Sequence, residues 1–102
     1  YINRLEYVEV IGRTIFYHII DGSVIEASGS MVELNDALLN HPNLIKPHRS
    51  YIINMDYIDT LSSREIIMKS RSIVPMARAN YQAIKSAYIN YTFSEHIVHD
   101  II

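Results

Sequence analysis

The chain contains no cysteine, which excludes disulfide scaffolds, thiolate zinc sites, iron–sulfur clusters and cysteine nucleophiles. Its three glycines, at positions 12, 22 and 29, are too few and too far apart for the glycine-rich loops that cradle phosphate in nucleotide-binding proteins. No apolar run reaches the roughly 18–20 residues that a membrane-spanning helix needs. These absences disfavour several classes of redox, nucleotide-binding and membrane protein, and we expect a cytoplasmic location with no membrane partner.

At 102 residues the chain has the size of one domain. Hydrophobic residues make up 49% of it and charged residues 20%, a balance that supports a compact core and argues against disorder. Its first residues, Tyr-Ile-Asn-Arg, have neither the basic start nor the apolar segment of a signal peptide. Because the chain does not begin with methionine, we expect it to be part of a longer protein.

Charge is distributed unevenly along the chain. The formal net charge is −2, which by itself disfavours nucleic-acid binding, because neutralising phosphates requires an excess of Lys and Arg. Residues 1–45 hold two Arg against six Asp and Glu, whereas residues 46–85 hold seven Lys and Arg against three Asp and Glu. Such a bipolar chain can present one basic face while its total charge stays near zero, so the pattern permits DNA binding without requiring it.

Short β-rich runs separated by turn residues dominate the chain. Asp21-Gly22 lies between two of these runs and is a strong hairpin signal. Ser30 and Glu33 have the spacing of a helix capping box, and Pro75 restricts the last strand to a sheet edge. The pattern predicts helices at 30–39 and 78–91, and strands at 5–11, 14–20, 23–28, 44–46, 50–53, 57–61, 65–69 and 72–75. Because most of these strands follow one another through very short connections, without the regular alternation of strand and helix that parallel sheets need, we expect a mainly-β domain of antiparallel strands.

No arrangement of residues typical of catalysis stands out. Ser30 is not part of a serine-hydrolase nucleophile motif, and we expect Glu6 and Glu9 to be ordinary exposed carboxylates on a strand. His96 and His99 have the spacing that a helix would align for metal binding, but no third ligand accompanies them. We therefore expect no catalytic activity, no metal ion and no cofactor.

The most informative segment runs from Lys46 to Ile58 and reads Lys-Pro-His-Arg-Ser-Tyr-Ile-Ile-Asn-Met-Asp-Tyr-Ile. A cationic loop leads into an apolar strand, a short polar break follows, and a second strand begins. Arg49 in this loop offers a planar guanidinium that suits phosphate or the edge of guanine.

The part of this segment from His48 to Ile58 resembles the signature of the LytTR family almost position by position. LytTR domains are the DNA-binding output domains of many bacterial response regulators. The resemblance covers roughly residues 1–90, because segments 5–9, 19–22, 30–34 and 73–78 also look like family elements at matching spacing. A resemblance of this extent is specific, unlike a short motif match.

The resemblance implies a mainly-β fold of about ten mostly antiparallel strands in small sheets, with two short helices. It further implies a transcription regulator of a two-component system that inserts loops into the major groove of double-stranded DNA, usually at direct repeats in a promoter. Family members are normally joined to an upstream phosphoacceptor receiver domain. On this basis we expect residues 1–92 to form the DNA-binding domain, residues 93–102 to form a C-terminal tail, and a homodimer to be possible.

Residues that the resemblance carries over as DNA contacts lie in loops. Arg13 lies between the first two strands, His48 and Arg49 lie in the loop before the signature strand, and Arg78 opens the last helix. A cation at a helix start opposes the helix dipole, which is consistent with a binding role for Arg78. Three residues on turns among the later strands are expected to contact phosphates only: Arg64, Lys69 and Arg71.

Each of these residues also has an ordinary structural interpretation. Arg49 could pair with Asp56 or Asp59 across a hairpin, and His48 could pack or cap a turn. Arg78 could pair with a carboxylate, and an arginine in a glycine turn could simply be solvated.

DNA binding has one alternative at the level of the whole domain, a protein-interaction module on the same fold in which DNA binding is weak or lost. The negative net charge favours it. The apolar end of the tail, residues 97–102, favours it too, because it could dock on the domain or on a neighbouring protomer.

Overall fold

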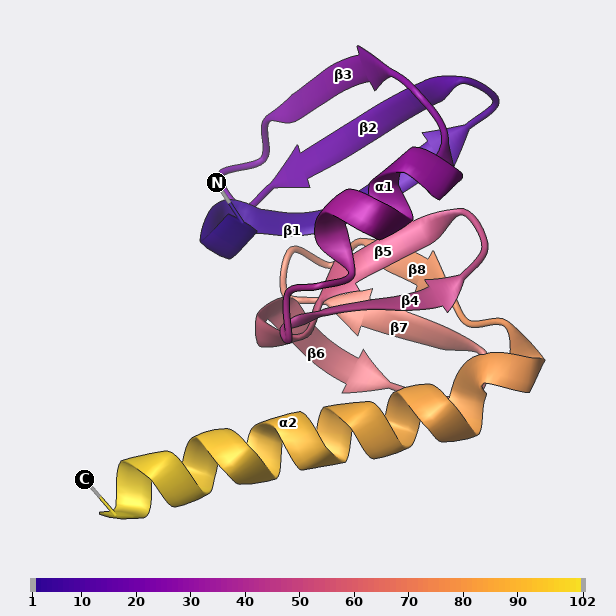
Figure 1. The fold of residues 1–102 in the computed structure, drawn as a ribbon. Helices are drawn as coiled ribbons and strands as arrows, with labels where there is room; N and C mark the ends of the chain where they lie inside the picture. Colours follow the sequence, from indigo (N-terminus) through magenta and orange to yellow (C-terminus); the bar gives the residue numbers. More distant parts are fainter. Residues whose placement is uncertain (1, 102) are drawn as a thin grey trace.

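A computed structural model describes residues 2–101, with their side chains as far as Ser94. Within this range eight strands form two antiparallel sheets, and two α-helices pack against them (Figure 1). The larger sheet has the order β3-β2-β1-β5-β4, with β1 at Leu5–Ile11, β2 at Thr14–Ile19, β3 at Val24–Ser28, β4 at Leu44–His48 and β5 at Tyr51–Asn54. The smaller sheet has the order β6-β7-β8, with β6 at Ile58–Leu61, β7 at Glu65–Met68 and β8 at Ile73–Pro75.

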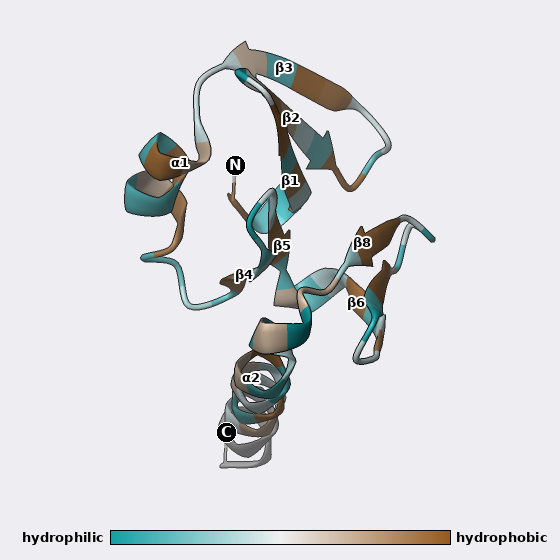
Figure 2. Ribbon diagram, turned by 90° about the vertical axis from the view of Figure 1, so that its right-hand side faces the viewer, coloured by the Kyte–Doolittle hydropathy of each residue, from teal (hydrophilic) through white to brown (hydrophobic). Residues whose placement is uncertain are grey.

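The larger sheet is covered on both faces. Helix α1 (Met31–Leu38) lies on one side of it and the smaller sheet on the other (Figure 2). One core lies against α1 and comprises Leu5, Val8, Ile15, Leu34, Leu38, Leu44 and Ile52. A second core joins the two sheets and helix α2 (Tyr81–Ile101) and comprises Tyr7, Ile53, Met55, Ile58, Ile66, Met68, Val74, Met76 and Ile84. With cores on both faces, β1 and β5 form a rigid support for the turns at their ends.

The mainly-β class predicted from the sequence is confirmed, and each predicted strand lies within two residues of its observed position. The described residues contain eight strands, where the resemblance implied about ten. Pro75 ends an edge strand, as its missing N–H requires. Across the residues that the structure describes, no helix is long and apolar enough to cross a membrane.

The last helix differs from its prediction at both ends. A 3₁₀ turn at Arg78–Asn80 precedes it, so α2 begins at Tyr81, and it continues to Ile101 instead of ending near residue 91. The extension is understandable because residues 92–101 contain no glycine or proline that would stop a helix. The apolar end of the tail and both candidate metal-binding histidines fall beyond the side chains that the structure describes. The boundary between domain and tail stays a prediction.

Glycines form the turns at the two ends of β2. Gly12 has φ 61° and is the first residue of the two-residue turn Gly12-Arg13, a pattern typical of a type II′ hairpin turn. The predicted Asp-Gly pair also lies in a hairpin turn, but only its glycine, Gly22, has positive φ (93°). Ile19 N–H donates to the carbonyl of Ser23, so this loop has three residues rather than two.

A fully buried asparagine joins several backbone segments. Asn54 at the end of β5 donates from Nδ2 to the carbonyl oxygens of Leu5 (2.9 Å) and Ile2 (3.4 Å). Its Oδ1 accepts from the backbone N–H of Asp56 (2.9 Å) and from Nδ2 of Asn43 (3.3 Å). Sequence analysis treated Asn54 only as part of a polar break, whereas it is the centre of a buried hydrogen-bond network.

The predicted exposure of Glu6 is wrong. Its residue surface is only 4% exposed, and its Oε2 accepts the backbone N–H of Ser70 (3.1 Å) from the turn between β7 and β8. A carboxylate is tolerated there because it receives a hydrogen bond from the chain that buries it. This bond places the β7–β8 turn beside the beginning of β1.

Two aromatic rings stack where β1 and β2 pair. The His18 ring lies nearly parallel to the Tyr7 ring, with centroids 4.1 Å apart. His18 Nε2 is buried and has no hydrogen-bond partner among the described residues. Burial lowers the pKa of His18, and the negative charges of Glu9 and Glu6 oppose this effect only in part.

This lowered pKa predicts how stability depends on pH. Below about pH 6.5, the ordinary histidine pKa, the unfolded chain binds a proton at His18 that the folded chain does not. We therefore expect His18 to contribute most stability above pH 6.5, and this contribution to fall as the pH drops toward the lower folded-state pKa. Urea unfolding of wild type and His18→Phe between about pH 7.5 and 5 tests this. An equal pH dependence in both proteins would contradict it.

Candidate nucleic-acid interface

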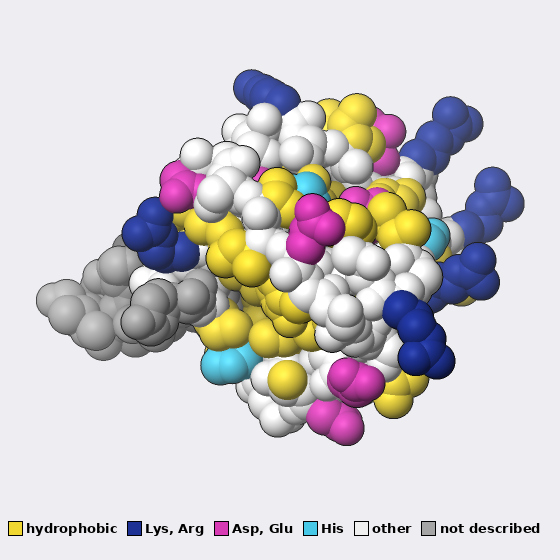
Figure 3. All heavy atoms as spheres, turned by 90° about the horizontal axis from the view of Figure 1, so that it is seen from above, with side chains coloured by type: hydrophobic (Ala, Val, Ile, Leu, Met, Phe, Trp, Pro, Cys, Tyr) yellow, Lys and Arg dark blue, Asp and Glu magenta, His cyan; other side chains and the backbone are white. Residues whose placement is uncertain are grey.

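Four arginines come from four separate turns. Arg13 lies in the β1–β2 turn, Arg49 in the β4–β5 turn, Arg64 in the β6–β7 turn, and Arg78 in the 3₁₀ turn before α2. The four turns lie along the right-hand edge of the molecule in Figure 1. Lys and Arg side chains project from the same edge when the molecule is seen from above (Figure 3).

Backbone hydrogen bonds hold three of these turns to one another. The carbonyl of Ser50 in the β4–β5 turn accepts from Val10 N–H (2.9 Å) near the end of β1. The carbonyl of Pro47 accepts from Ala77 N–H (3.0 Å) just before the 3₁₀ turn.

A third backbone bond connects the β6–β7 turn to the same group. The carbonyl of Arg64 itself accepts from Met76 N–H (3.1 Å), next to Ala77. The arginine-bearing turns therefore belong to one connected structure rather than to independent loops.

None of the four arginines is neutralised within the described part of the chain. Arg13, Arg49, Arg64 and Arg78 are all exposed, and none has an ion pair or a side-chain hydrogen bond there. We call this group, together with His48, the basic edge. Guanidinium groups without partners on a common edge make it a candidate site for an anionic partner, since each retains all its donors.

His48 contributes a different kind of group. Its Nδ1 accepts the N–H of Ser50 (3.1 Å), so in the neutral ring the proton is on Nε2. Its ring packs edge-on against Tyr51, with centroids 5.7 Å apart. The interpretation that His48 packs and braces a turn is confirmed, and Nε2–H remains as a donor for a ligand.

The Tyr51 side chain is also held by a residue of β1. Its hydroxyl donates to Oε2 of Glu9 (2.6 Å). Burial, the hydrogen bond to Glu9 and the charge of that carboxylate raise the pKa of Tyr51 to about 12, so the hydroxyl remains a donor at neutral pH. One oxygen of the Glu9 carboxylate is therefore occupied by the Tyr51 hydroxyl.

Two of the predicted phosphate contacts lie elsewhere. Lys69 and Arg71 lie in the β7–β8 turn, beside the start of β1, because Ser70 N–H donates to Glu6. β1 has seven residues, so about 20 Å of strand separates this turn from the basic edge. Arg71 also forms an ion pair with Asp59 (2.7 Å) and has φ 78°.

The ion pairs of the domain do not involve these four arginines. Among the described residues both ion pairs lie away from the basic edge, Arg71 with Asp59 (2.7 Å) and Arg4 with Asp21 (3.7 Å). Among the described residues Arg49 forms no ion pair with Asp56 or Asp59; Asp59 pairs with Arg71, and Asp56 accepts a hydrogen bond from the Tyr91 hydroxyl.

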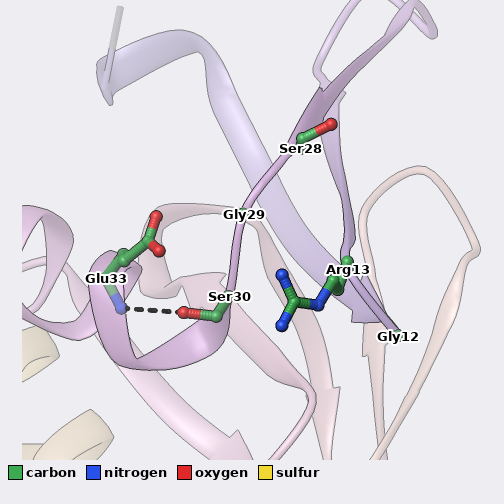
Figure 4. A pocket seen from close by; sticks show the side chains of 6 residues that line it. All are labelled: Gly12, Arg13, Ser28, Gly29, Ser30 and Glu33. Carbon is green, nitrogen blue, oxygen red and sulfur yellow. Dashed lines mark hydrogen bonds between the residues drawn. The ribbon is translucent and has the colours of Figure 1, made fainter.

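A hollow of about 720 Å³ adjoins Arg13 (Figure 4). It lies between the β1–β2 turn and the beginning of α1, where Ser30 Oγ accepts the N–H of Glu33 (3.4 Å) as predicted for a capping residue. The close-up shows the Arg13 guanidinium beside Ser30 at this hollow. Within the described residues no cluster of three metal-ligating side chains occurs.

Comparison with known proteins identifies the family. A family model described as the LytTr DNA-binding domain matches residues 1–89. The chain belongs to this family. The LytTr domain is a DNA-binding domain, and it occurs in response regulators that control transcription.

Two relatives agree with this assignment. This chain is 31% identical over 83 residues to the sensory transduction protein LytT of Oceanobacillus iheyensis. The match covers 74% of this chain and 33% of that protein. The chain therefore spans about a third of the length of that curated relative. A solved LytTr domain from a Bacillus cereus protein described as a methyl-accepting/DNA response regulator has a TM-score of 0.69 at 17% identity. That match covers 85% of this chain and 82% of the other, and it supports the fold.

Proposed function

We propose that the basic edge of this LytTr domain binds duplex DNA sequence-specifically and that the domain regulates transcription in the cytoplasm as the output part of a two-component response regulator. One observation supports this proposal above others. Four unpaired arginines from four turns converge on one edge, whereas both described ion pairs lie elsewhere. A chain of net charge −2 thus concentrates positive charge where a polyanion can bind.

The roles of the residues follow from where their side chains project. Arg13 and Arg49 are on exposed two-residue hairpin turns, which are narrow enough to enter a major groove, and an arginine there can bind both acceptors of guanine. Arg78 lies on the 3₁₀ turn before α2, and we assign to it a contact with either a base or a phosphate. His48 Nε2–H and Arg64 are assigned to phosphates, which fix the register of the protein on the duplex.

Lys69 and Arg71 receive no direct contact in this proposal. A straight duplex against the basic edge does not reach the β7–β8 turn about 20 Å away. The proposal also includes paired direct repeats as the target and an upstream receiver domain as the neighbouring part of the protein.

The proposal is tested by fluorescence anisotropy of the 102-residue chain. One duplex carries the sequence upstream of the chain's own gene, and a second duplex carries the same bases in scrambled order. We expect tighter binding to the first, with affinity falling steeply between about 50 and 200 mM salt, since phosphate neutralisation releases counterions.

Equal, weak and salt-insensitive binding to both duplexes would contradict the proposal. That result would favour a protein-interaction module on the same fold, and the exposed apolar side chains Val24 and Ile25 on the edge strand β3 would be its first candidate surface.

A further inference from the structure

Arg78 lies between two hydrogen bonds to the same atom. The carbonyl oxygen of Pro47 accepts from Ala77 N–H (3.0 Å) on one side of Arg78 and from Asn80 Nδ2 (3.2 Å) on the other. A carbonyl has two lone pairs, so these donors use its full capacity. We call this pair of bonds the Pro47 clamp.

The Pro47 clamp connects two parts of the basic edge. Pro47 is fully buried and precedes His48 and Arg49 in the chain, so its position is fixed by the sheet. The turn that carries Arg78 has no side-chain cap at Ala77. Without the Asn80 side chain, the bond from Ala77 N–H would be the one hydrogen bond among the described residues between this turn and the Pro47 carbonyl.

Helix α2 has other attachments to the domain. Ile84 is buried in the core between the sheets, and Tyr81 and Tyr88 pack against that core. Loss of the Asn80 side chain should therefore leave α2 docked and change mainly the position of the short turn before it.

We propose that Asn80 is a positioning residue for DNA binding, which holds Arg78 at a fixed place relative to Arg49 so that both arginines engage one duplex together. This inference rests on the proposed function of the basic edge. Asn80 is assigned to act through Arg78 and not by touching DNA itself, since one hydrogen of its Nδ2 donates to the Pro47 carbonyl.

The test combines Asn80→Ala with other substitutions in the 102-residue chain, using the duplex from upstream of its own gene. We expect Asn80→Ala to weaken binding nearly as much as Arg78→Ala, by roughly 5- to 150-fold, the range for one specific contact. Adding Asn80→Ala to Arg78→Ala should change affinity by less than about twofold, whereas its effect should add to that of Arg13→Ala.

Two further measurements separate positioning from a general loss of structure. The dependence of log K on log salt should flatten by about one in Asn80→Ala, as in Arg78→Ala, if Arg78 contacts a phosphate. Asn90→Ala is the matched control, since it makes the same change at an exposed site on α2, and it should bind like wild type.

Amide hydrogen exchange tests the Pro47 clamp without DNA. In the free protein, Ala77 N–H should exchange faster in Asn80→Ala while the amides of β1 and β5 keep their protection. Wild-type affinity in Asn80→Ala, or an effect that adds fully to that of Arg78→Ala, would overturn the inference. If wild type itself fails to prefer its own duplex, the proposed function fails, and the exchange result still decides whether the clamp holds the turn.

Discussion

Replacing Arg49 and Arg78 together with alanine is expected to weaken binding to the preferred duplex by about 2–6 kcal/mol, roughly 30-fold or more, because each specific contact contributes about 1–3 kcal/mol. Both side chains are exposed, and neither has an ion pair within the part of the chain that the structure describes. Their removal therefore costs little folding free energy, and the loss should arise in the complex. Anisotropy titrations with the preferred and scrambled duplexes measure it.

The matched control also removes two positive charges, but from the β7–β8 turn and not from the basic edge. Lys69→Ala with Arg71→Ala also lowers the net charge by two, yet both residues lie in the β7–β8 turn, away from the basic edge. We expect a small, sequence-independent weakening from the long-range charge alone. Equal losses in the two double variants would mean that binding depends on total charge, and the assignment of the basic edge would be wrong.

Asn54→Ala is expected to lower the free energy of unfolding by about 2–4 kcal/mol, because buried polar groups that lose their partners pay the full cost of leaving water. The side chain makes four hydrogen bonds. Its loss leaves the carbonyl of Leu5 and the N–H of Asp56 without these partners, and it opens space in a fully buried position. Urea unfolding followed by circular dichroism measures the change.

Asn40→Ala provides the comparison for this prediction. Asn40 is an exposed asparagine near the end of α1, and its amide donates to the carbonyl of Asp36 (3.3 Å). We expect a change within about 0.5 kcal/mol there, as for most surface substitutions. Similar stability losses in the two variants would show that the network around Asn54 contributes nothing beyond an ordinary surface bond.

Local features of the fold were accessible from the sequence. The strands are short and β-branched, Ser30 and Glu33 mark the start of α1, and Pro75 marks the end of an edge strand. Each of these features depends on residues that are close together in the sequence, so it can be recognised without knowing the fold. The end of α2 was harder to place, because a helix without a stop signal can continue beyond the part that packs.

The site could be predicted only in part, because ion pairs and hydrogen bonds between residues far apart in the sequence determine which side chains remain available for a ligand. The resemblance to the LytTR family pointed to Arg13, Arg49 and Arg78. It did not indicate that Arg71 pairs with Asp59 while Arg49 has no carboxylate partner among the described residues. Sequence patterns give no sign of which backbone carbonyl an asparagine side chain will bind. Asn80 was missed for this reason, since its acceptor lies 33 residues away.

The two-residue turns Gly12-Arg13 and Arg49-Ser50 have a consequence for how such a domain can evolve. Their side chains at positions 13 and 49 are exposed, while the hydrogen bonds that shape the turns come from other groups, namely the backbone and, in the second turn, the His48 ring. The residues assigned to reading DNA are thus largely separate from those that stabilise the fold. Under the proposed function, substitutions at these two positions are expected to change the preferred DNA sequence with little loss of stability, so that single mutations would let the domain recognise related promoters while the scaffold stays intact.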